Sequence, residues 1–226
     1  MLEYIKNAAE NSKKRSKERY VFDDTFVLIK DQLPYGIDID NVLNSVNLLV
    51  PKHLTKNLDV IYIGGFKEFD ERKVNAFYKD GALYITNDQE NENDMIDDIV
   101  HEIAHAAKAR FAEELYADGL LENEFLGKRK KLYFLLRGEG FDRPLEEFLK
   151  TEFQEDLDNY LYEIVGYPLL ANLTANLFYS PYAATSFDEY YANGFENYFI
   201  RDRKHLKDIS PMLYNKIKNI AEIEEI

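Results

Sequence analysis

The stretch His101-Glu102-Ile103-Ala104-His105 decides the fold that we expect for this chain. Residues four positions apart lie on one face of a helix, so both imidazoles can reach the same metal ion. Glu102 then stands where its carboxylate can accept a proton from a water bound to that metal. The chain has only 4 His in 226 residues, and two of the four stand at this spacing. We therefore predict a metal site on a helix.

The flanking sequence predicts that helix. Asn91, Asn93 and Asp94 supply N-capping side chains, and neither Pro nor Gly follows before Phe111. Apolar residues recur at three- and four-residue spacing, which predicts one buried stripe: Ile96, Ile99, Val100, Ile103, Ala107 and Phe111. The histidines lie on a face offset from this stripe, toward a cleft. The alternative, a chance arrangement on a solvated helix face, fits a buried helix poorly.

A catalytic zinc site takes three protein ligands and one water, so a third ligand is needed. Metzincins supply a third histidine, but Lys108 and Phe111 stand where that class has its glycine and histidine, which excludes it. His53 lies in a connecting segment and His205 in a charged run, and both are expected to be solvated or turn residues. We therefore expect a carboxylate downstream of the motif as the third ligand.

Glu189 is the leading candidate for that ligand. It shares a helix face with Asn193 and Glu196, while Ala192 leaves room beside a metal. Asn193 could hydrogen-bond the outer ring nitrogen of a zinc histidine. The alternative is a capping box, Ser186-Phe-Asp-Glu189, in which the carboxylate satisfies a backbone N–H of its own helix. This segment alone supports both equally, and five other downstream carboxylates stay open: Glu113, Glu114, Asp118, Glu122 and Glu124.

Together the two segments resemble the gluzincin metallopeptidases. The closer likeness is to the family of the anthrax lethal factor catalytic domain and the Pro-Pro endopeptidases, whose ligand helix reads like Glu189-Tyr-Tyr-Ala-Asn-Gly-Phe195. That family has a catalytic tyrosine seven residues before the glutamate ligand, the position of Tyr182 here. The resemblance covers residues 58–111 and 179–200. It implies zinc bound by His101, His105 and Glu189, with Glu102 as general base and Tyr182 as oxyanion donor.

The resemblance also implies a zincin-like α+β fold, with a small mixed sheet, an active-site helix and a largely helical C-terminal half. The segment between His105 and Glu189 looks longer than in that family. A second gluzincin group, the small peptidases that cleave phage and stress repressors, matches Ala192, Asn193 and Phe195 equally well.

The sequence before the zinc helix predicts strands. Residues 58–65 are β-branched and bounded by glycines, and residues 75–79 and 82–86 flank the turn Asp80-Gly81. In zincins the strand just before the active-site helix is an edge strand, to which an extended substrate can add. We expect either such an edge in the second arm or an ordinary hairpin.

The rest of the chain reads as one domain, 1–226, with a helical insertion at about 112–178. We expect a charged helix over residues 3–20 and a strand over residues 22–29. Asp38 or Asp40 caps a helix through Leu49. A helix is expected over 145–164, ended at Pro168, and the last helices over 186–200 and from Pro211 onward.

Composition limits the partners. With a net charge of −14, the chain is a poor candidate for sequence-independent nucleic-acid binding. Residues 1–20 and 128–131 are basic, and we expect them to be solvated surface. The absence of Cys excludes disulfides and thiolate zinc sites. No apolar signal core or membrane-spanning run is present, so we expect a cytoplasmic protein without a membrane partner, with non-classical export or phage delivery as the other routes.

We therefore expect a zinc metalloendopeptidase with one Zn²⁺ per chain and a protein or peptide substrate. A zinc-bound water, activated by Glu102, would hydrolyse the peptide bond. A non-catalytic binding or structural protein that keeps a zincin fold is the competing class, against which the intact Glu102 argues. A hydrolase of a non-protein bond and a repressor-cleaving gluzincin are further alternatives, and the oligomeric state is open.

Overall fold

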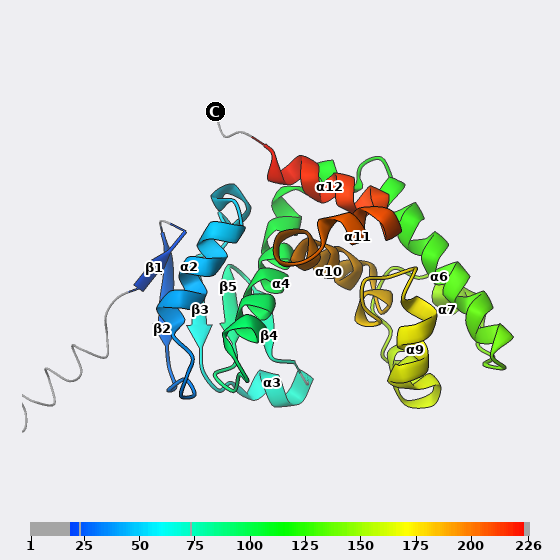
Figure 1. Cartoon of the computed structure of the whole chain (residues 1–226), viewed down its shortest axis with the longest axis horizontal. Coiled ribbons are helices and arrows are strands. Elements are labelled where there is room, and N and C mark those ends of the chain that lie inside the picture. The colour runs from blue at the N-terminus through cyan, green and yellow to red at the C-terminus, as the bar shows by residue number, and fades with distance from the viewer. Residues whose placement is uncertain (1–18, 23, 73, 224–226) are drawn as a thin grey trace, which may run out of the picture.

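The computed structural model describes residues 19–22, 24–72 and 74–223. Strands and helices are interspersed up to residue 85, and the described elements after it are all helical, which makes an α+β arrangement (Figure 1). The helix expected over residues 3–20 lies outside the described residues except for Arg19 and Tyr20, which belong to a strand instead. Within the described residues, no helix combines the length and apolar character that a membrane crossing requires.

A mixed five-stranded sheet forms one half of the molecule. Its spatial order is β1-β2-β3-β5-β4, with the three inner strands parallel and the two outer strands antiparallel to their neighbours. The strands are β1 (Arg19–Val21), β2 (Thr25–Ile29), β3 (Val60–Ile63), β4 (Ala76–Lys79) and β5 (Ala82–Ile85). The strand expected over 22–29 is therefore present but begins at Thr25.

The hairpin of β4 and β5 forms where the sequence predicted it. Asp80 has φ 49° and Gly81 φ 83°, the left-handed pair that a two-residue turn of type I′ requires. The expectation that the strand just before the helix is an edge strand is wrong. β5 pairs with β4 on one side and, in parallel, with β3 on the other, so the first arm, β4, is the edge.

The core lies between the sheet and two helices, α2 (Ile39–Leu49) and α4 (Glu92–Arg110). Alternation along the strands buries Ile61 and Ile63 of β3 completely, and one side of each helix packs over them. Asp38 is the N-cap of α2, where its side chain accepts a hydrogen bond from the Asp40 N–H. An aromatic cluster combines Tyr62, Phe77 and Tyr84 of three strands with Phe69 of α3 (Lys67–Arg72) and with Phe66 just before that helix.

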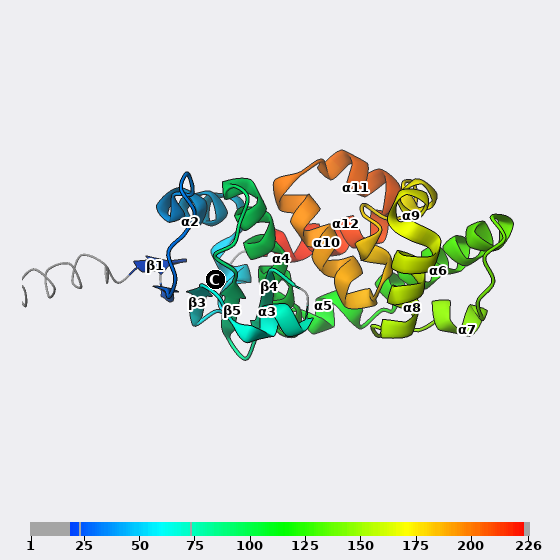
Figure 2. The same ribbon diagram turned by 90° about the horizontal axis from the view of Figure 1, so that it is seen from below.

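The second half of the molecule is helical. Figure 2 shows α4 between the sheet and α10, with α6, α7, α8 and α9 on the far side of α10. The helices of this half are α5 (Ala112–Tyr116), α6 (Leu120–Gly138), α7 (Leu145–Phe148), α8 (Glu155–Asn159), the π-helical η2 (Tyr160–Gly166), α9 (Tyr167–Thr174), the 3₁₀ turn η3 (Tyr182–Ala184), α10 (Phe187–Ile200), α11 (Arg203–Ile209) and α12 (Pro211–Ala221). A further 3₁₀ turn, η1 (Lys52–Leu54), follows α2.

The single helix expected over residues 145–164 is wrong. The chain leaves the helical conformation after Phe148 and resumes it only at Glu155. Phe153, placed by its spacing on the buried side of that helix, is 53% exposed. Pro168 does not end a helix here but stands in the first turn of α9, where its missing N–H costs nothing.

Two charged or polar segments are more buried than expected. Within the basic run 128–131, Lys128 and Arg129 are buried and donate hydrogen bonds to backbone carbonyl groups. Lys130 and Lys131 are exposed, so the expectation of a solvated surface is wrong for the first two residues and confirmed for the last two. His53 is also buried, with its Nε2 2.7 Å from the carbonyl oxygen of Ile220. Long-range carbonyl partners supply the hydrogen bonds that water would otherwise supply.

Candidate metal centre

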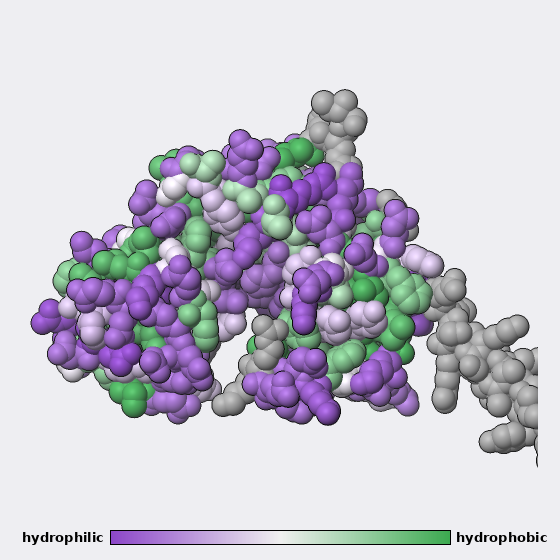
Figure 3. All heavy atoms as spheres, turned by 180° about the vertical axis from the view of Figure 1, so that it is seen from behind, coloured by the Kyte–Doolittle hydropathy of each residue, from purple (hydrophilic) through white to green (hydrophobic). Residues whose placement is uncertain are grey.

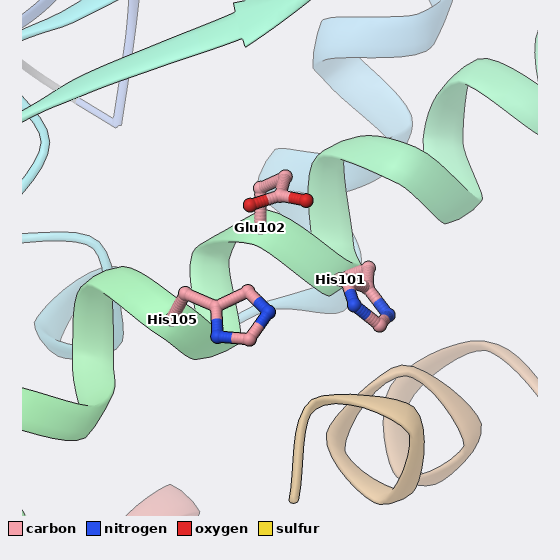
Figure 4. Close-up of side chains that lie close together, drawn as sticks. All are labelled: His101, Glu102 and His105. Atoms are coloured by element: carbon pink, nitrogen blue, oxygen red, sulfur yellow. The ribbon is translucent and has the colours of Figure 1, made fainter. Parts of the chain in front are cut away.

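The histidine motif lies on α4, as predicted. Asn91 is the N-cap, and its side chain accepts hydrogen bonds from the N–H groups of Asn93 and Asp94. The predicted apolar stripe is buried throughout, which directs the opposite side of the helix toward α10. Figure 4 shows His101 and His105 projecting on the same side of α4, with Glu102 on an adjoining side.

Glu189, near the start of α10, reaches both histidines. Its carboxylate lies 3.1 Å from the Nε2 of His101 and 3.9 Å from the Nε2 of His105. The Glu189 N–H meanwhile donates to the Oγ of Ser186 at 3.1 Å, which is half of the predicted capping box. Only the serine half of the capping box is therefore seen, because the Glu189 carboxylate, which the capping alternative assigned to a backbone N–H, lies against the histidines.

The spacing of these donor atoms suits a tetrahedral metal ion. Zinc bonds of about 2.0–2.2 Å at tetrahedral angles separate neighbouring donor atoms by roughly 3.4 Å. The Oε2 of Glu189 lies 3.1 Å from the His101 Nε2 and its Oε1 lies 3.9 Å from the His105 Nε2, so each histidine is within about 0.5 Å of that separation from one carboxylate oxygen. Two imidazoles and one carboxylate are also a donor set that zinc accepts, with one position left for water.

The described residues offer a second donor set in which Glu102 replaces Glu189. The ligand atoms of His101, Glu102 and His105 all lie within 4.8 Å of one another. The Glu189 carboxylate, by contrast, contacts both imidazoles from the facing helix. Glu102 instead accepts a hydrogen bond from the backbone N–H of Tyr78 on β4.

The outer nitrogen of His101 has a different partner from the one predicted. Its Nδ1 lies 3.5 Å from a carboxylate oxygen of Glu196, one turn beyond Asn193 on α10. Asn193 is buried, and its Oδ1 has no hydrogen-bond partner among the described residues. A carboxylate at this place orients the imidazole and raises its basicity.

In the metal-free site, burial and nearby charges shift the pKa values of the two histidines in opposite directions. Burial alone lowers the pKa of His101, but hydrogen bonds to Glu189 and Glu196 outweigh it and raise that pKa to about 10. Burial lowers the pKa of His105 to about 4, so its imidazole is neutral and ready to coordinate. Burial raises the pKa of Glu102 to about 7, against the opposing effect of His101.

Tyr182 lies beside these groups, in the 3₁₀ turn η3. Its ring centroid is 6.4 Å from that of His101, and its hydroxyl hydrogen-bonds the Glu189 carboxylate. Burial and the nearby carboxylates raise the pKa of this phenol, so it stays protonated and can donate a hydrogen bond. The side chain is nevertheless 47% exposed, which leaves it accessible from the cleft.

The other candidate carboxylates lie elsewhere. Glu113, Glu114, Asp118 and Glu122 are exposed, and Asp118 pairs with Lys216. Glu124 accepts hydrogen bonds from the Tyr190 hydroxyl and from backbone N–H groups at the start of α12. These residues therefore contribute to the surface or to helix packing rather than to the histidine site.

A cavity of about 330 Å³ adjoins His101. It is lined from the sheet half by residues 74–76, from α4 and α10 by charged and amide side chains, and from the turn region by Ser180 and Tyr182. Figure 3 shows the surface hollowed between the sheet half and the helical half. The lining of the cavity includes Asp97 and Asp98, which were not among the residues predicted from the sequence. Their positions four and three residues before His101, on the same helix face, could have identified them.

Comparisons of the chain with protein families, curated proteins and solved structures found no match. The function is therefore argued from the geometry and chemistry of this site.

Proposed function

We propose that this protein is a zinc metalloendopeptidase of the gluzincin type with a zincin-like fold. His101, His105 and Glu189 would hold one zinc ion. The observation that carries the proposal is the contact of the Glu189 carboxylate with both histidines, which unites the two sequence motifs in one donor set. The position of Tyr182 beside Glu189 supports the likeness to the family of the lethal factor catalytic domain and the Pro-Pro endopeptidases.

A bound zinc ion would act as a Lewis acid toward the scissile carbonyl and the attacking water. Glu102 would accept the proton of that water and pass it to the leaving amine. It is held for this role by the N–H of Tyr78 and by its place next to His101. The hydroxyl of Tyr182 would donate a hydrogen bond to the oxyanion that develops on the substrate carbonyl.

The edge strand β4 supports a peptide as the substrate. Thr86 donates to the carbonyl oxygen of Asn75 at 2.8 Å, so alternate residues of this strand direct their backbone groups toward β5. Those of Ala76 and Tyr78 therefore face away from the sheet. The Tyr78 N–H already donates to Glu102, so it is Ala76, which lines the cavity beside His101, that offers this edge to a peptide. An extended peptide can hydrogen-bond to such an edge with its backbone next to the metal centre.

The proposal is tested by zinc content and by peptide cleavage. Elemental analysis of the purified protein is expected to find one zinc per chain, and His101→Ala is expected to lose it. A peptide library digested with and without a chelator, and read by mass spectrometry, is expected to show cleavage that the chelator abolishes.

Glu102→Gln is the matched control, because it keeps the size of the side chain and removes the proton acceptor. It is expected to retain zinc and fold but lose most turnover. Full activity in this variant would reject the mechanism, and full zinc affinity in His101→Ala would reject the site.

A further inference from the structure

Two neighbouring cations of α6, Lys128 and Arg129, are buried in the helical half. Within the part of the chain that the structure describes, their hydrogen-bond acceptors are backbone carbonyl oxygens and one serine hydroxyl, and none is a carboxylate. A buried charge without a counterion is costly, and apolar side chains of similar volume often fill such a place with greater stability. Packing alone therefore does not explain the two cations, and their reason lies in the groups that they bind.

Lys128 binds one end of the segment formed by residues 177–185. Its ammonium group donates to the carbonyl oxygen of Leu177. The same group donates to the carbonyl oxygen of Ile209 at 2.6 Å and to the Oγ of Ser210 at 2.8 Å, between α11 and α12. This end of the segment is thus held to α6 and to the α11–α12 junction by one side chain.

Arg129 binds the other end of the segment. One terminal nitrogen of its guanidinium group donates to the carbonyl oxygens of Ala184 and Thr185, at 2.7 and 3.1 Å. The other terminal nitrogen donates to the carbonyl oxygen of Glu147 on α7 at 2.9 Å. The planar guanidinium group fixes the directions of these bonds as well as their lengths, which an ammonium group does not.

Tyr182 lies between these two attachments. Residues 175–181 form neither helix nor strand, so contacts with other elements set the course of the chain there. The N–H and the Oγ1 of Thr185 both donate to the carbonyl oxygen of Tyr182, at 3.0 and 2.8 Å. Arg129 therefore binds a residue that is itself bonded to Tyr182.

An oxyanion donor such as the proposed Tyr182 hydroxyl must be placed accurately. Its hydroxyl has to lie about 2.7–3.1 Å from the oxyanion, and a displacement of about 1 Å can lower the rate by about 10²-fold. The side chain of Tyr182 is 47% exposed, so packing around its ring is incomplete. Its position therefore depends on the backbone that carries it.

We infer that Lys128 and Arg129 are positioning residues for Tyr182. Through the backbone of residues 177–185 they hold its hydroxyl beside the Glu189 carboxylate, where it can reach the substrate carbonyl. This inference rests on the proposed peptidase function, in which Tyr182 is the oxyanion donor. The alternative is that the two cations serve the stability of the fold alone.

The first test measures the position of Tyr182 and needs no catalysis. Tyrosine carrying ¹³C at Cζ is incorporated, and the Tyr182 signal is assigned by its absence in Tyr182→Phe. Arg129→Lys keeps the charge but not the planar group, and it is expected to shift or broaden this signal while the signal of the buried Tyr191 stays in place. Lys130→Met, at the exposed neighbouring position, is the matched control and should change neither signal. An unchanged Tyr182 signal in Arg129→Lys would overturn the inference, as would equal changes at Tyr191.

The second test measures kinetics of the zinc-loaded protein on a cleaved peptide, at a temperature where circular dichroism shows every variant to be folded. Arg129→Lys is expected to lower kcat by about 10-fold or more, with KM changed by less than about 3-fold and zinc content unchanged. In the Tyr182→Phe background, the same substitution should lower kcat by less than about 2-fold, because the group that it positions is already absent. Equal losses in the two backgrounds would leave Arg129 a role in stability alone and overturn the inference.

Lys128→Gln repeats both tests at the other end of the segment, and it decides the outcome if Arg129→Lys does not fold. It removes the charge and shortens the side chain but keeps an N–H donor, and it is expected to give the same pattern. Loss of zinc with an unchanged Tyr182 signal would show that the cations position Glu189 instead, and would overturn the assignment to Tyr182. A changed Tyr182 signal in a protein that cleaves no peptide would reject the peptidase function and leave the positioning of Tyr182 intact.

Discussion

The carboxylate of Glu189 lies 3.1 Å from the Nε2 of His101, although the two residues are 88 positions apart. This contact joins α4 to α10, two helices that pack closely along their length. The packing of two helices therefore sets the geometry of the candidate metal centre, and changes at this contact are expected to alter metal binding before they alter the fold.

Glu189→Gln should weaken zinc binding by orders of magnitude, because a neutral amide replaces an anionic ligand. The variant keeps the backbone N–H that Ser186 caps, so its free energy of unfolding without metal should change little. Competition with a chromophoric chelator measures the affinity. Ser186→Ala is the control, since it should cost about 1 kcal/mol of stability through the lost cap and leave zinc affinity near the wild-type value. Unchanged zinc affinity in Glu189→Gln would move the third ligand to another carboxylate.

Tyr182→Phe should lower kcat by roughly 10²-fold with zinc content unchanged, because it removes one hydrogen-bond donor to the developing oxyanion. Steady-state kinetics on a cleaved peptide, with elemental analysis of the same sample, check this. Tyr162→Phe is a suitable control, since Tyr162 is 61% exposed on η2 and does not line the cavity. Equal turnover of Tyr182→Phe and the wild type would give Tyr182 a packing role only.

Zinc affinity should rise with pH well above neutrality. Hydrogen bonds to Glu189 and Glu196 raise the pKa of His101 to about 10 in the metal-free protein, so zinc must displace a proton there. Each pH unit below that pKa should change the apparent affinity by about tenfold through this one proton. The affinity should therefore increase from pH 7 to pH 9, measured by chelator competition. A plateau above pH 7 would show instead that His101 has an ordinary pKa.

Arg129 should be among the most important residues for stability outside the metal centre. It is fully buried on α6 and donates to the carbonyl oxygens of Ala184, Thr185 and Glu147, so it holds the segment that joins η3 to α10. Arg129→Met should lower the free energy of unfolding by roughly 3–5 kcal/mol, because it leaves these buried carbonyl groups unpaired. Urea denaturation measures the loss.

Lys130→Met, at the exposed neighbouring position, should change stability by less than about 0.5 kcal/mol and is the matched control. Similar stability of the two variants would contradict a structural role for the buried guanidinium.

Several features could be predicted from the sequence because their causes are local. The helix around His101 depends on an N-cap at Asn91 and on apolar spacing within the same segment. The hairpin depends on Asp80-Gly81, whose left-handed conformations lie within the turn itself. Tyr182 was selected through the family resemblance rather than from a local pattern, and its hydroxyl lies at the Glu189 carboxylate.

Features that depend on distant partners could not be predicted with the same certainty. Spacing alone placed residues 145–164 on one helix, but Phe153 is 53% exposed, and the carbonyl groups of Glu147 and Thr151 accept hydrogen bonds from Arg129 on α6 and from the Phe187 N–H rather than from a continuing helix. The charge pattern placed Lys128 and Arg129 at the surface. Both side chains are buried, and backbone carbonyl groups far along the chain accept their hydrogen bonds. Likewise, β5 is an inner strand because β3, which comes earlier in the sequence, pairs with it in parallel.

By itself, the sequence determined that two histidines and a glutamate share a helix, because helical periodicity is a property of neighbouring residues. The tertiary structure alone decided which carboxylate faces them. Glu189 was one of several downstream acids, and its capping role fitted the sequence as well as a ligand role did. The packing of α10 against α4 directs its carboxylate to His101 and His105. That choice depends on where two helices meet in space, and no local pattern contains this information.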